Sequence, residues 1–258
     1  MQRLEKISKK NKDYILLFTN PLKEIRTKEE VIIKYGFIHK MDVEDDIFES
    51  FLNDVSYYDF YYLGLSYLKI SRSQNEVLDY LTKNGCSYKM AIDITKKYIS
   101  MHLINDLELA NFLVCHLIKN HKGPNEIIEA LKRREIPISI IQKSLDNYSL
   151  DAQYENVFYL LQHSFSSLSK KPRIKGIRDF YEKCEKKGFM HKIVKKVIEE
   201  NEEILDNIID EDELIERDFM KAKKHYEKKY NGLKLNQKII SNLLSKGYCY
   251  EKIKKILE

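Results

Sequence analysis

Glycine and proline are scarce in this 258-residue chain, which contains 8 glycines and 4 prolines. An average soluble protein has roughly 12% of these two residues, so the scarcity disfavours turn-rich sandwiches, barrels and Rossmann folds. No two glycines lie within nine residues of each other, which excludes a G-x-G-x-x-G turn and a phosphate-binding P-loop. With 43% hydrophobic and 33% charged residues, the composition instead predicts an extended helical protein that can still form a core.

Long apolar runs and closely spaced cysteines are also missing. The longest nearly apolar runs, such as Tyr14 to Phe18 and Phe112 to Ile118, are far shorter than the roughly 20 residues that span a bilayer. No apolar signal core follows the charged N-terminus. The four cysteines form no C-x-x-C pair, which is typical of reduced, buried thiols. We therefore expect a cytoplasmic protein that does not enter membranes.

A short segment that ends an amphipathic stretch recurs four times along the chain. Apolar residues precede each copy at helical spacing, as Val77 and Leu78 precede Leu81, and glycine closes three of the four copies. A longer helical stretch precedes each copy, at Tyr57–Lys69, Leu107–Asn120, Gln153–Ser167 and Glu213–Tyr230. A second one follows it, at Tyr88–Ser100, Ser139–Asn147, His191–Glu200 and Tyr250–Leu257. The four copies are Leu81–Cys86, Leu131–Ile136, Cys184–Phe189 and Leu243–Tyr248. The pattern predicts a unit of three helices in about 50 residues, repeated four times.

These repeats predict a mainly α fold in which about four tandem three-helix repeats stack into an elongated curved solenoid, because three short helices cannot bury their apolar faces alone. The predicted repeats are residues 56–102, 103–150, 151–205 and 206–258. Residues 1–55 do not match the repeat and predict a small N-terminal appendage. In it we expect a β-hairpin and short helices, at Leu4–Ser8 with Tyr14–Phe18, Lys28–Tyr35 and Glu44–Asn53.

Capping residues agree with these boundaries. Ser73 to Glu76 reads as a capping box that opens the second helix of the first repeat. Asn105 is a good N-cap for the first helix of the next repeat. Pro124, Pro137 and Pro172 fall where a first helical turn is expected and proline is tolerated.

No set of residues has the spacing of an active site. The seven histidines form no H-E-x-x-H motif, and Cys115-His116 with His121 reads as a core position rather than a metal site. Paired acids such as Asp45-Asp46 lie at helix starts, where a helix N-terminus favours them. We expect no enzyme activity, no metal site and no cofactor.

Cationic residues instead recur at the start and end of the second helix of each repeat. Residues 169–189 hold eight Lys or Arg against three acids, while residues 199–218 hold eleven acids against Arg217 alone. The acidic stretch at 199–213 is a hinge, an ordered helix or a segment that masks the basic residues. A basic stripe of this kind suits a phosphate backbone, or an acidic nucleoprotein surface, better than base-specific readout, although solubility alone also explains lysines. The candidate contact residues are Arg72, Lys122, Arg133, Arg134, Lys171, Arg173, Lys175 and Arg178.

An ordered series of motifs resembles the RecX family, which regulates the RecA recombinase. Tyr67–Val77 resembles its "YLxxRxRSxxE" opening, with Ile70 or its neighbour in place of the first Arg. Leu103–Ala110 resembles "LLND-x-x-FA", with Leu109 replacing the aromatic. The remaining matches are Lys122–Ile127 to "KGPxxI" with Asn125 where Arg is common, Lys132–Ile136 to "LxxKGI" with Glu135 replacing Gly, and Lys186–Phe189 to "RRGF".

The resemblance implies a non-enzymatic protein that binds RecA or the RecA filament on single-stranded DNA, along the filament groove. Double-stranded DNA is a further candidate partner. In the family this limits strand exchange, ATP hydrolysis and co-protease activity, and therefore modulates homologous recombination, DNA repair and the SOS response. We expect a monomer, because nothing in the sequence indicates a coiled coil.

Three other functions fit parts of the pattern. A helical-repeat scaffold that binds only protein would ignore DNA and recombinase. A helix-turn-helix DNA-binding regulator would need a polar recognition helix after a fixed turn, which no repeat contains. A subunit whose nuclease site is completed by another chain is the third.

Overall fold

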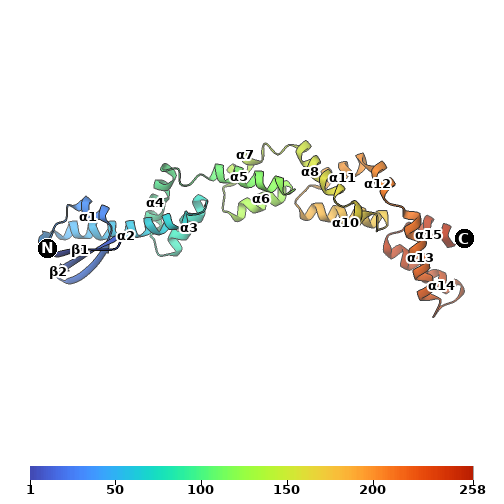
Figure 1. Cartoon of the computed structure of the whole chain (residues 1–258), viewed down its shortest axis with the longest axis horizontal. Coiled ribbons are helices and arrows are strands. Elements are labelled where there is room, and N and C mark those ends of the chain that lie inside the picture. Colours follow the sequence, from blue (N-terminus) through green and yellow to red (C-terminus); the bar gives the residue numbers. More distant parts are fainter. Residues whose placement is uncertain (258) are drawn as a thin grey trace. The chain divides into compact units, whose positions relative to one another are not determined.

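The computed structural model describes residues 1–257, which form mainly α-helices and one small sheet (Figure 1). The expectation of a mainly α fold is therefore confirmed. The chain divides into two compact units. Unit 1 comprises Met1–Leu109 with Arg134–Pro137, and unit 2 comprises Ala110–Arg133 with the chain from Ile138 onward. None of the helices within residues 1–257 combines the length and the apolar character that crossing a membrane requires.

Four antiparallel strands at the N-terminus form a sheet in the order β3-β2-β1-β4. The strands are β1 (Gln2–Lys10), β2 (Asp13–Thr19), β3 (Leu22–Thr27) and β4 (Met41–Val43). The predicted hairpin is β1 with β2. The two edge strands were not predicted. Three of the six residues of β3 are charged, as is common in edge strands, and this hides its alternation in the sequence.

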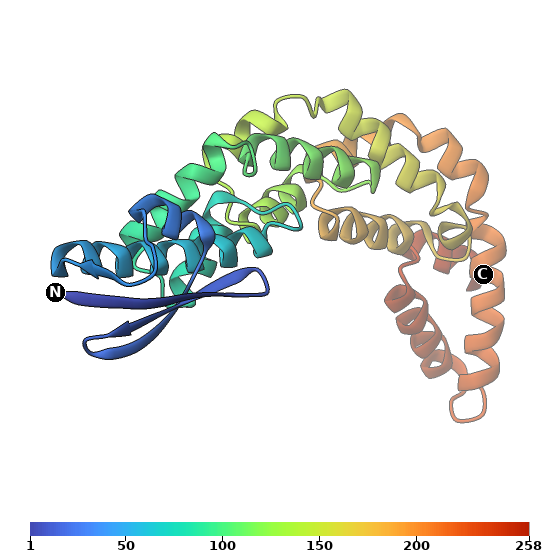
Figure 2. The same ribbon diagram turned by 60° about the vertical axis from the view of Figure 1, so that its left-hand side comes forward.

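Helices α1 (Glu29–Tyr35) and α2 (Asp45–Tyr67) complete the N-terminal core, and Figure 2 shows the hairpin strands beside α2. The ring of Phe18 on β2 is fully buried, with its centroid 4.8 Å from that of Phe48 on α2. The sequence predicted two separate helices on either side of residue 55, but α2 is continuous. It contains no proline, and one helix serves two cores: its first half packs on the sheet and its second half, through Tyr61, on the following helices.

The second half of α2 packs with α3 (Gln74–Lys83) and α4 (Tyr88–Ser100). Val77, Leu81 and Tyr98 are fully buried in this core. The predicted capping box is present: Ser73 Oγ accepts from the Glu76 N–H at 3.1 Å, and the Glu76 carboxylate accepts from the Ser73 N–H at 2.8 Å.

Helix α5 (Asp106–Lys119) follows, and the N-cap predicted at Asn105 accepts from the Glu108 N–H at 3.2 Å. The remaining helices are α6 (Pro124–Arg133), α7 (Ile138–Leu145), α8 (Leu150–Gln162), α9 (Phe165–Leu168), α10 (Arg173–Lys186), α11 (His191–Glu200), α12 (Glu202–Ile208), α13 (Glu211–Tyr226), α14 (Gly232–Lys246) and α15 (Tyr250–Leu257). Helices α4, α11 and α15 have the predicted bounds. Cys115 on α5, which the sequence placed in the core, is exposed.

Two stretches of unit 2 differ from the sequence expectation. The helix predicted over residues 153–167 is broken at His163 and Ser164, where the Ser164 hydroxyl donates to the Leu160 carbonyl at 2.6 Å. Such a side-chain bond competes with the helical backbone pattern. The acidic stretch at 199–213 includes the ordered helix α12, separated from α11 by Asn201 and from α13 by residues 209–210.

Helices α3, α6, α10 and α14 are the second helices of the predicted repeats, and we call them the middle helices. The first turn of α6 meets the chain that follows α10 (both in unit 2). The Gly123 N–H donates to the Lys187 carbonyl at 2.7 Å, and the Asn125 N–H donates to the Gly188 carbonyl at 3.1 Å. A Cβ on Gly123 would lie 2.3 Å from the Gly188 carbonyl carbon. Only glycine permits this approach of two backbones.

The same kind of contact recurs at two other middle helices. Within unit 2, Gly247 after α14 lies against Lys175 in the first turn of α10. Within unit 1, the residues after α6 meet the first turn of α3. There Arg134 donates to both Glu76 oxygens at 2.7 and 3.0 Å, and the Asn75 side chain donates to the Glu135 carbonyl at 2.9 Å. The two contacts within unit 2 place the negative end of one helix dipole near the positive end of another, which is favourable.

A left-handed residue ends each of these segments. Gly85, Gly188 and Gly247 have φ of 93°, 88° and 101°, and Glu135 has φ of 54°. The replacement of glycine by Glu135 in the repeated segment therefore changes the residue but not the sign of φ. A residue with a Cβ pays roughly 1–2 kcal/mol for this backbone conformation.

Replacing Gly188 by alanine tests the backbone contact. A Cβ there would lie 2.3 Å from the Glu126 nitrogen, and its φ is positive. We expect G188A to lower the unfolding free energy by about 3 kcal/mol, the sum of overpacking and left-handed strain. The control is G232A in the same unit, where φ is also positive but nothing lies within 4 Å; it should lose only about 1 kcal/mol. Urea unfolding followed by circular dichroism measures both, and equal losses would contradict a rigid contact.

Removing Arg134 tests the contact in unit 1. The Glu76 side chain is 13% exposed, so R134M leaves a poorly hydrated carboxylate and should cost about 2 kcal/mol. The neighbouring Arg133 is 64% exposed and pairs only with Glu126 at 3.3 Å. R133M should therefore cost less than about 0.5 kcal/mol. The same unfolding measurement distinguishes them, and a loss of similar size in both variants would rule out a structural role for the Arg134 pair.

The pH dependence of stability gives a further check on Glu76. Burial raises the pKa of this carboxyl, but hydrogen bonds from Arg134 and the Ser73 N–H lower it more, leaving the pKa below the ordinary value of 4.5. A carboxyl with a lowered folded-state pKa stabilises the fold above its unfolded pKa and loses this effect as pH falls through the folded value. The stability advantage of the wild type over E76Q should thus be full at pH 7 and shrink below about pH 4.5. A constant difference down to pH 3 would contradict this.

Candidate nucleic-acid interface

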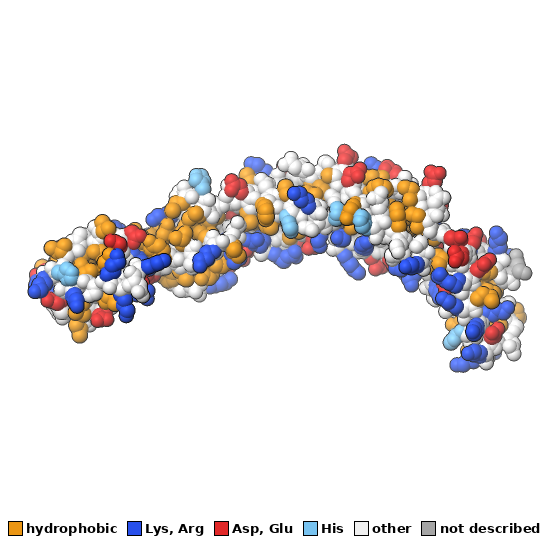
Figure 3. All heavy atoms as spheres, in the orientation of Figure 1, with side chains coloured by type: hydrophobic (Ala, Val, Ile, Leu, Met, Phe, Trp, Pro, Cys, Tyr) orange, Lys and Arg blue, Asp and Glu red, His pale blue; other side chains and the backbone are white. Residues whose placement is uncertain are grey.

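Basic side chains gather over α6 and α10 in unit 2, along the lower edge of this part of the molecule in Figure 3. Acidic side chains of the same unit lie on the opposite edge and in the C-terminal part in this view. We call the cations of α6, α10 and their flanking residues the basic face. Its members are Lys122, Lys132, Arg133, Lys170, Lys171, Arg173, Lys175, Arg178, Lys183, Lys186 and Lys187. Whether each one can bind a ligand depends on its present partners.

The cations of α6 are paired with acids of the same helix. Arg133 lies 3.3 Å from Glu126, and Lys132 lies 2.9 Å from Glu129. Both cationic side chains are more than half exposed, so these pairs contribute little to stability. An anionic ligand could replace the carboxylate partners at small cost.

The first two turns of α10 carry cations without such partners. Arg178 is exposed and Lys175 is half-buried, and within the described residues no carboxylate lies at ion-pair distance from either. Lys171 is hydrogen-bonded to Asp179 at 2.7 Å. This bond lowers the pKa of the Asp179 carboxyl despite partial burial, and the charges of Lys175 and Arg178 lower it further. The surface around Asp179 therefore has a positive potential.

Arg173, at the start of α10, is already bound by the acidic stretch. Its guanidinium pairs with Asp206 of α12, and its N–H donates to Glu211 of α13 at 3.2 Å. Its side chain is only 26% exposed. The acidic stretch was predicted to be a hinge, an ordered helix or a masking segment. Its residues Glu202–Ile208 form the ordered helix α12, and Asp206 on this helix neutralises the candidate contact residue Arg173.

The two candidate residues of unit 1 also have internal partners. Arg134 is held by Glu76 and donates to the Ser71 carbonyl at 2.8 Å. The guanidinium of Arg72 lies 4.2 Å from the ring centroid of Tyr67, which stacks on Tyr80 at 3.9 Å. The Arg72 Nε is buried and has no hydrogen-bond partner. Arg134 stabilises the first turn of α3, and Arg72 belongs to a stack of aromatic rings.

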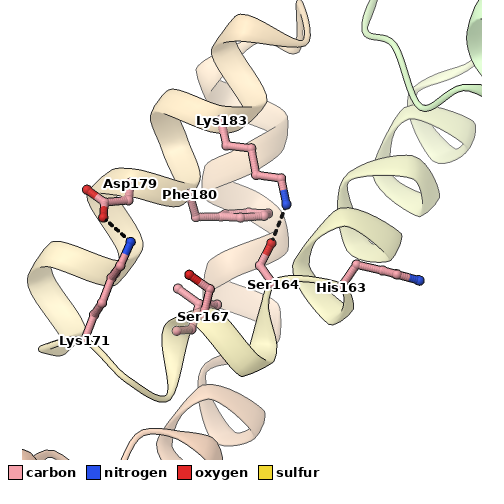
Figure 4. A pocket seen from close by; sticks show the side chains of 9 residues that line it. His163, Ser164, Ser167, Lys171, Asp179, Phe180 and Lys183 are labelled. Atoms are coloured by element: carbon pink, nitrogen blue, oxygen red, sulfur yellow. Dashed lines mark hydrogen bonds and ion pairs between the residues drawn. The ribbon is translucent and has the colours of Figure 1, made fainter.

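A small cavity of about 180 Å³ opens between α8, α9 and α10 (Figure 4). Figure 4 shows Lys171 directed to Asp179, and Lys183 directed to Ser164 at 2.8 Å. The Ser164 hydroxyl donates to a backbone carbonyl and no base contacts it, so it is not set up as a nucleophile. The lining residues are His163, Ser164, Ser167, Leu168, Lys171, Gly176, Asp179, Phe180 and Lys183. In residues 1–257 no group of three His, Cys, Asp or Glu side chains is placed to hold a metal ion.

Lys183 and Lys187 were not among the predicted contact residues, although Lys122 was. Burial lowers the pKa of the Lys187 ammonium, and the charges of Lys122 and Lys183 lower it further. The Lys187 ammonium therefore lies within electrostatic range of both Lys122 and Lys183. The spacing of four between Lys183 and Lys187 was visible in the sequence, but the proximity of Lys122 depends on the tertiary contact at Gly123.

The chain is similar over nearly its whole length to proteins named regulatory protein RecX. It is 29% identical to the protein of Listeria monocytogenes over 262 residues, which cover 97% of this chain and 93% of the relative. It is 26% identical to the protein of Staphylococcus aureus strain N315 over 258 residues, covering 98% and 93%. The protein of Oceanobacillus iheyensis is 26% identical over 235 residues, covering 89% and 85%. No family model matches the chain.

Two solved structures have related folds. A crystal structure of a regulatory protein RecX is 19% identical and superposes with a TM-score of 0.64, covering 77% of this chain and 100% of its own. The crystal structure of RecX from Lactobacillus salivarius is 25% identical with a TM-score of 0.53, covering 56% and 95%. The matches agree with the motif series that begins at Tyr67 and extends to Phe189. These matches confirm the resemblance to the RecX regulatory proteins that the motif series predicts.

Proposed function

We propose that this chain is a non-enzymatic, cytoplasmic modulator of homologous recombination and the SOS response. It binds RecA, or the RecA filament on single-stranded DNA, along the filament groove. Binding inhibits strand exchange, ATP hydrolysis and co-protease activity. The observation that carries this proposal is the similarity to RecX regulatory proteins over nearly the full length of both chains.

The basic face supports binding to a charged filament. Its cations are spread along α6 and α10 without a helix that is set out from the core to read bases. Phosphate contacts of this kind position a protein on nucleic acid but carry no sequence information. They suit a partner that coats DNA of any sequence.

The recurring contacts between middle helices support the predicted division into repeats at 56–102, 103–150, 151–205 and 206–258. Each contact joins residues of the same two positions in the repeated unit: the first turn of one middle helix and the end of the next. A surface built from repeated units can contact a repeated partner at several points, each of them weak. Such binding depends steeply on salt when phosphates take part.

Among the eight candidate contact residues, we propose Lys122, Arg133, Lys175 and Arg178 as the principal contacts, because each is unpaired or weakly paired. Lys171 and Arg72 are secondary, since Asp179 and Tyr67 already engage them. Arg134 and Arg173 stabilise the fold through internal ion pairs. Their substitution should lower stability before it lowers binding.

The proposal is tested with the DNA-dependent ATPase of RecA on circular single-stranded DNA. Increasing amounts of this chain are added before or after filament assembly, at low and at raised salt. Substoichiometric inhibition that weakens with salt supports the proposal. Absence of inhibition at large excess, with the helical content intact, would contradict it and favour a scaffold that binds only protein.

Charge reversal on α10 tests the basic face within the same assay. We expect K175E/R178E to raise the concentration for half-maximal inhibition about tenfold, because two cations that contact phosphates become anions. The matched control is K143E/K192E, which reverses two exposed lysines on α7 and α11. Circular dichroism should show the same helical content for both. An effect of the control as large as that of the α10 variant would show that only net charge matters.

A further inference from the structure

The backbone contact at Gly123 sets two lysines side by side. Lys122 directly precedes Gly123, and Lys187 supplies the carbonyl that accepts from the Gly123 N–H at 2.7 Å. The Asn125 N–H bonds the next carbonyl along, that of Gly188, at 3.1 Å. The two lysines thus come from segments 65 residues apart and are fixed by backbone atoms that cannot rotate away.

Lys183 adds a third ammonium to this pair. It lies one helical turn before Lys187 on α10, a spacing that brings side chains to about 5–6 Å between Cβ atoms. Its ammonium donates to the Ser164 hydroxyl at 2.8 Å, at the rim of the cavity in Figure 4. Lys183 is therefore held by one neutral hydrogen bond and no charge.

The ammonium groups of Lys122 and Lys183 repel that of Lys187 without compensation from a carboxylate. Burial lowers the pKa of Lys187, and the charges of Lys122 and Lys183 lower it further. Within the described chain no carboxylate lies at ion-pair distance from any of the three. Other cations of the basic face do have acidic partners: Lys132, Arg133, Lys171 and Arg173. The fold gains nothing from this cluster, because like charges at such spacing are destabilising.

We propose that Lys122, Lys183 and Lys187 together bind one phosphate group of single-stranded DNA. This inference rests on the proposed function and assigns a phosphate subsite to the basic face. One phosphate shared by three ammonium groups would relieve their repulsion. Lysine acts as a point charge, whereas the planar fork of arginine suits paired carboxylates of a protein partner. Three ammonium groups without a carboxylate partner suit a compact oxyanion such as phosphate, and the backbone contact fixes the positions from which Lys122 and Lys187 reach it.

Direct binding to DNA tests this subsite apart from RecA. The probe is a fluorescently labelled oligothymidylate, titrated with the full chain at several NaCl concentrations and followed by anisotropy. For K122Q/K183Q/K187Q we expect the dissociation constant to rise at least tenfold. We also expect the slope of log K against log salt to fall in magnitude by about 0.7, the value for one phosphate on a single strand. The control K143Q/K192Q/K195Q removes three exposed lysines on α7 and α11 and should change the dissociation constant less than twofold.

Three results would overturn the inference. One is a loss of DNA affinity no greater than that of the control variant. The second is a slope change near 2, which would mean that each lysine contacts its own phosphate. The third is unchanged DNA binding together with lost capture of DNA-free RecA, which would assign the cluster to an acidic protein surface.

Failure of this inference is distinguishable from failure of the proposed function. The wild-type chain would still inhibit the RecA ATPase if only the phosphate subsite were misassigned. Conversely, loss of oligothymidylate binding in the triple variant, with no effect of the wild type on RecA, would leave the subsite in place and remove the recombinase from the proposal. Circular dichroism of each variant must match the wild type for these comparisons.

Discussion

The contact between Gly123 and the Lys187–Gly188 backbone is the constraint on which the rest of unit 2 depends. It lets the positive end of α6 meet the negative end of α10 at hydrogen-bond distance, and neither glycine has room for a Cβ. Because backbone atoms make the contact, the positions of the flanking side chains follow from it. Lys122 and Lys187 are neighbours for this reason and not because of any attraction between them. A fold constraint thus generates a local concentration of positive charge that no pairwise interaction would favour.

The distribution of acids, more than the number of lysines, decides which parts of the basic face can bind. On α6 each cation has a carboxylate one or two turns away on the same helix, while on α10 the acidic partners are fewer and one of them, Asp179, is occupied by Lys171. The acidic stretch takes Arg173 out of the exposed set. Within the described residues, the cations of the basic face without a carboxylate at ion-pair distance are Lys122, Lys170, Lys175, Arg178, Lys183, Lys186 and Lys187. A count of charges along the sequence gives the sign of the face but not this pattern.

Most helices could be predicted from the sequence, but the contacts between them could not. Periodicity predicts α4, α11 and α15 to the residue, since this signal is local. The sequence did not predict α2 as one continuous helix. Its two halves pack in different cores, so the buried face changes midway, and in the sequence this change looks like the end of one helix and the start of another. The edge strands β3 and β4 depend on pairing with residues far along the chain. The partners of Arg134 lie 58 and 63 residues away, so no local pattern separates it from the exposed Arg133 beside it.

Glu135 shows which property the repeated segment has to retain. It stands where the other three copies have glycine, yet its φ of 54° is also left-handed, and its carbonyl accepts a hydrogen bond from Asn75 much as that of Gly188 accepts one from Asn125. At Gly188 two backbones touch, whereas nothing lies within 4 Å of a Cβ on Gly85. At Glu135, where glycine is absent, side chains join the segment after α6 to the first turn of α3. Arg134 is bonded to both carboxylate oxygens of Glu76. The strain of a left-handed glutamate, roughly 1–2 kcal/mol, is offset by this charged pair. The four copies therefore share a left-handed residue that sets the direction of the chain after each middle helix. Glycine provides it in three copies, and a glutamate supported by a charged pair provides it in the fourth.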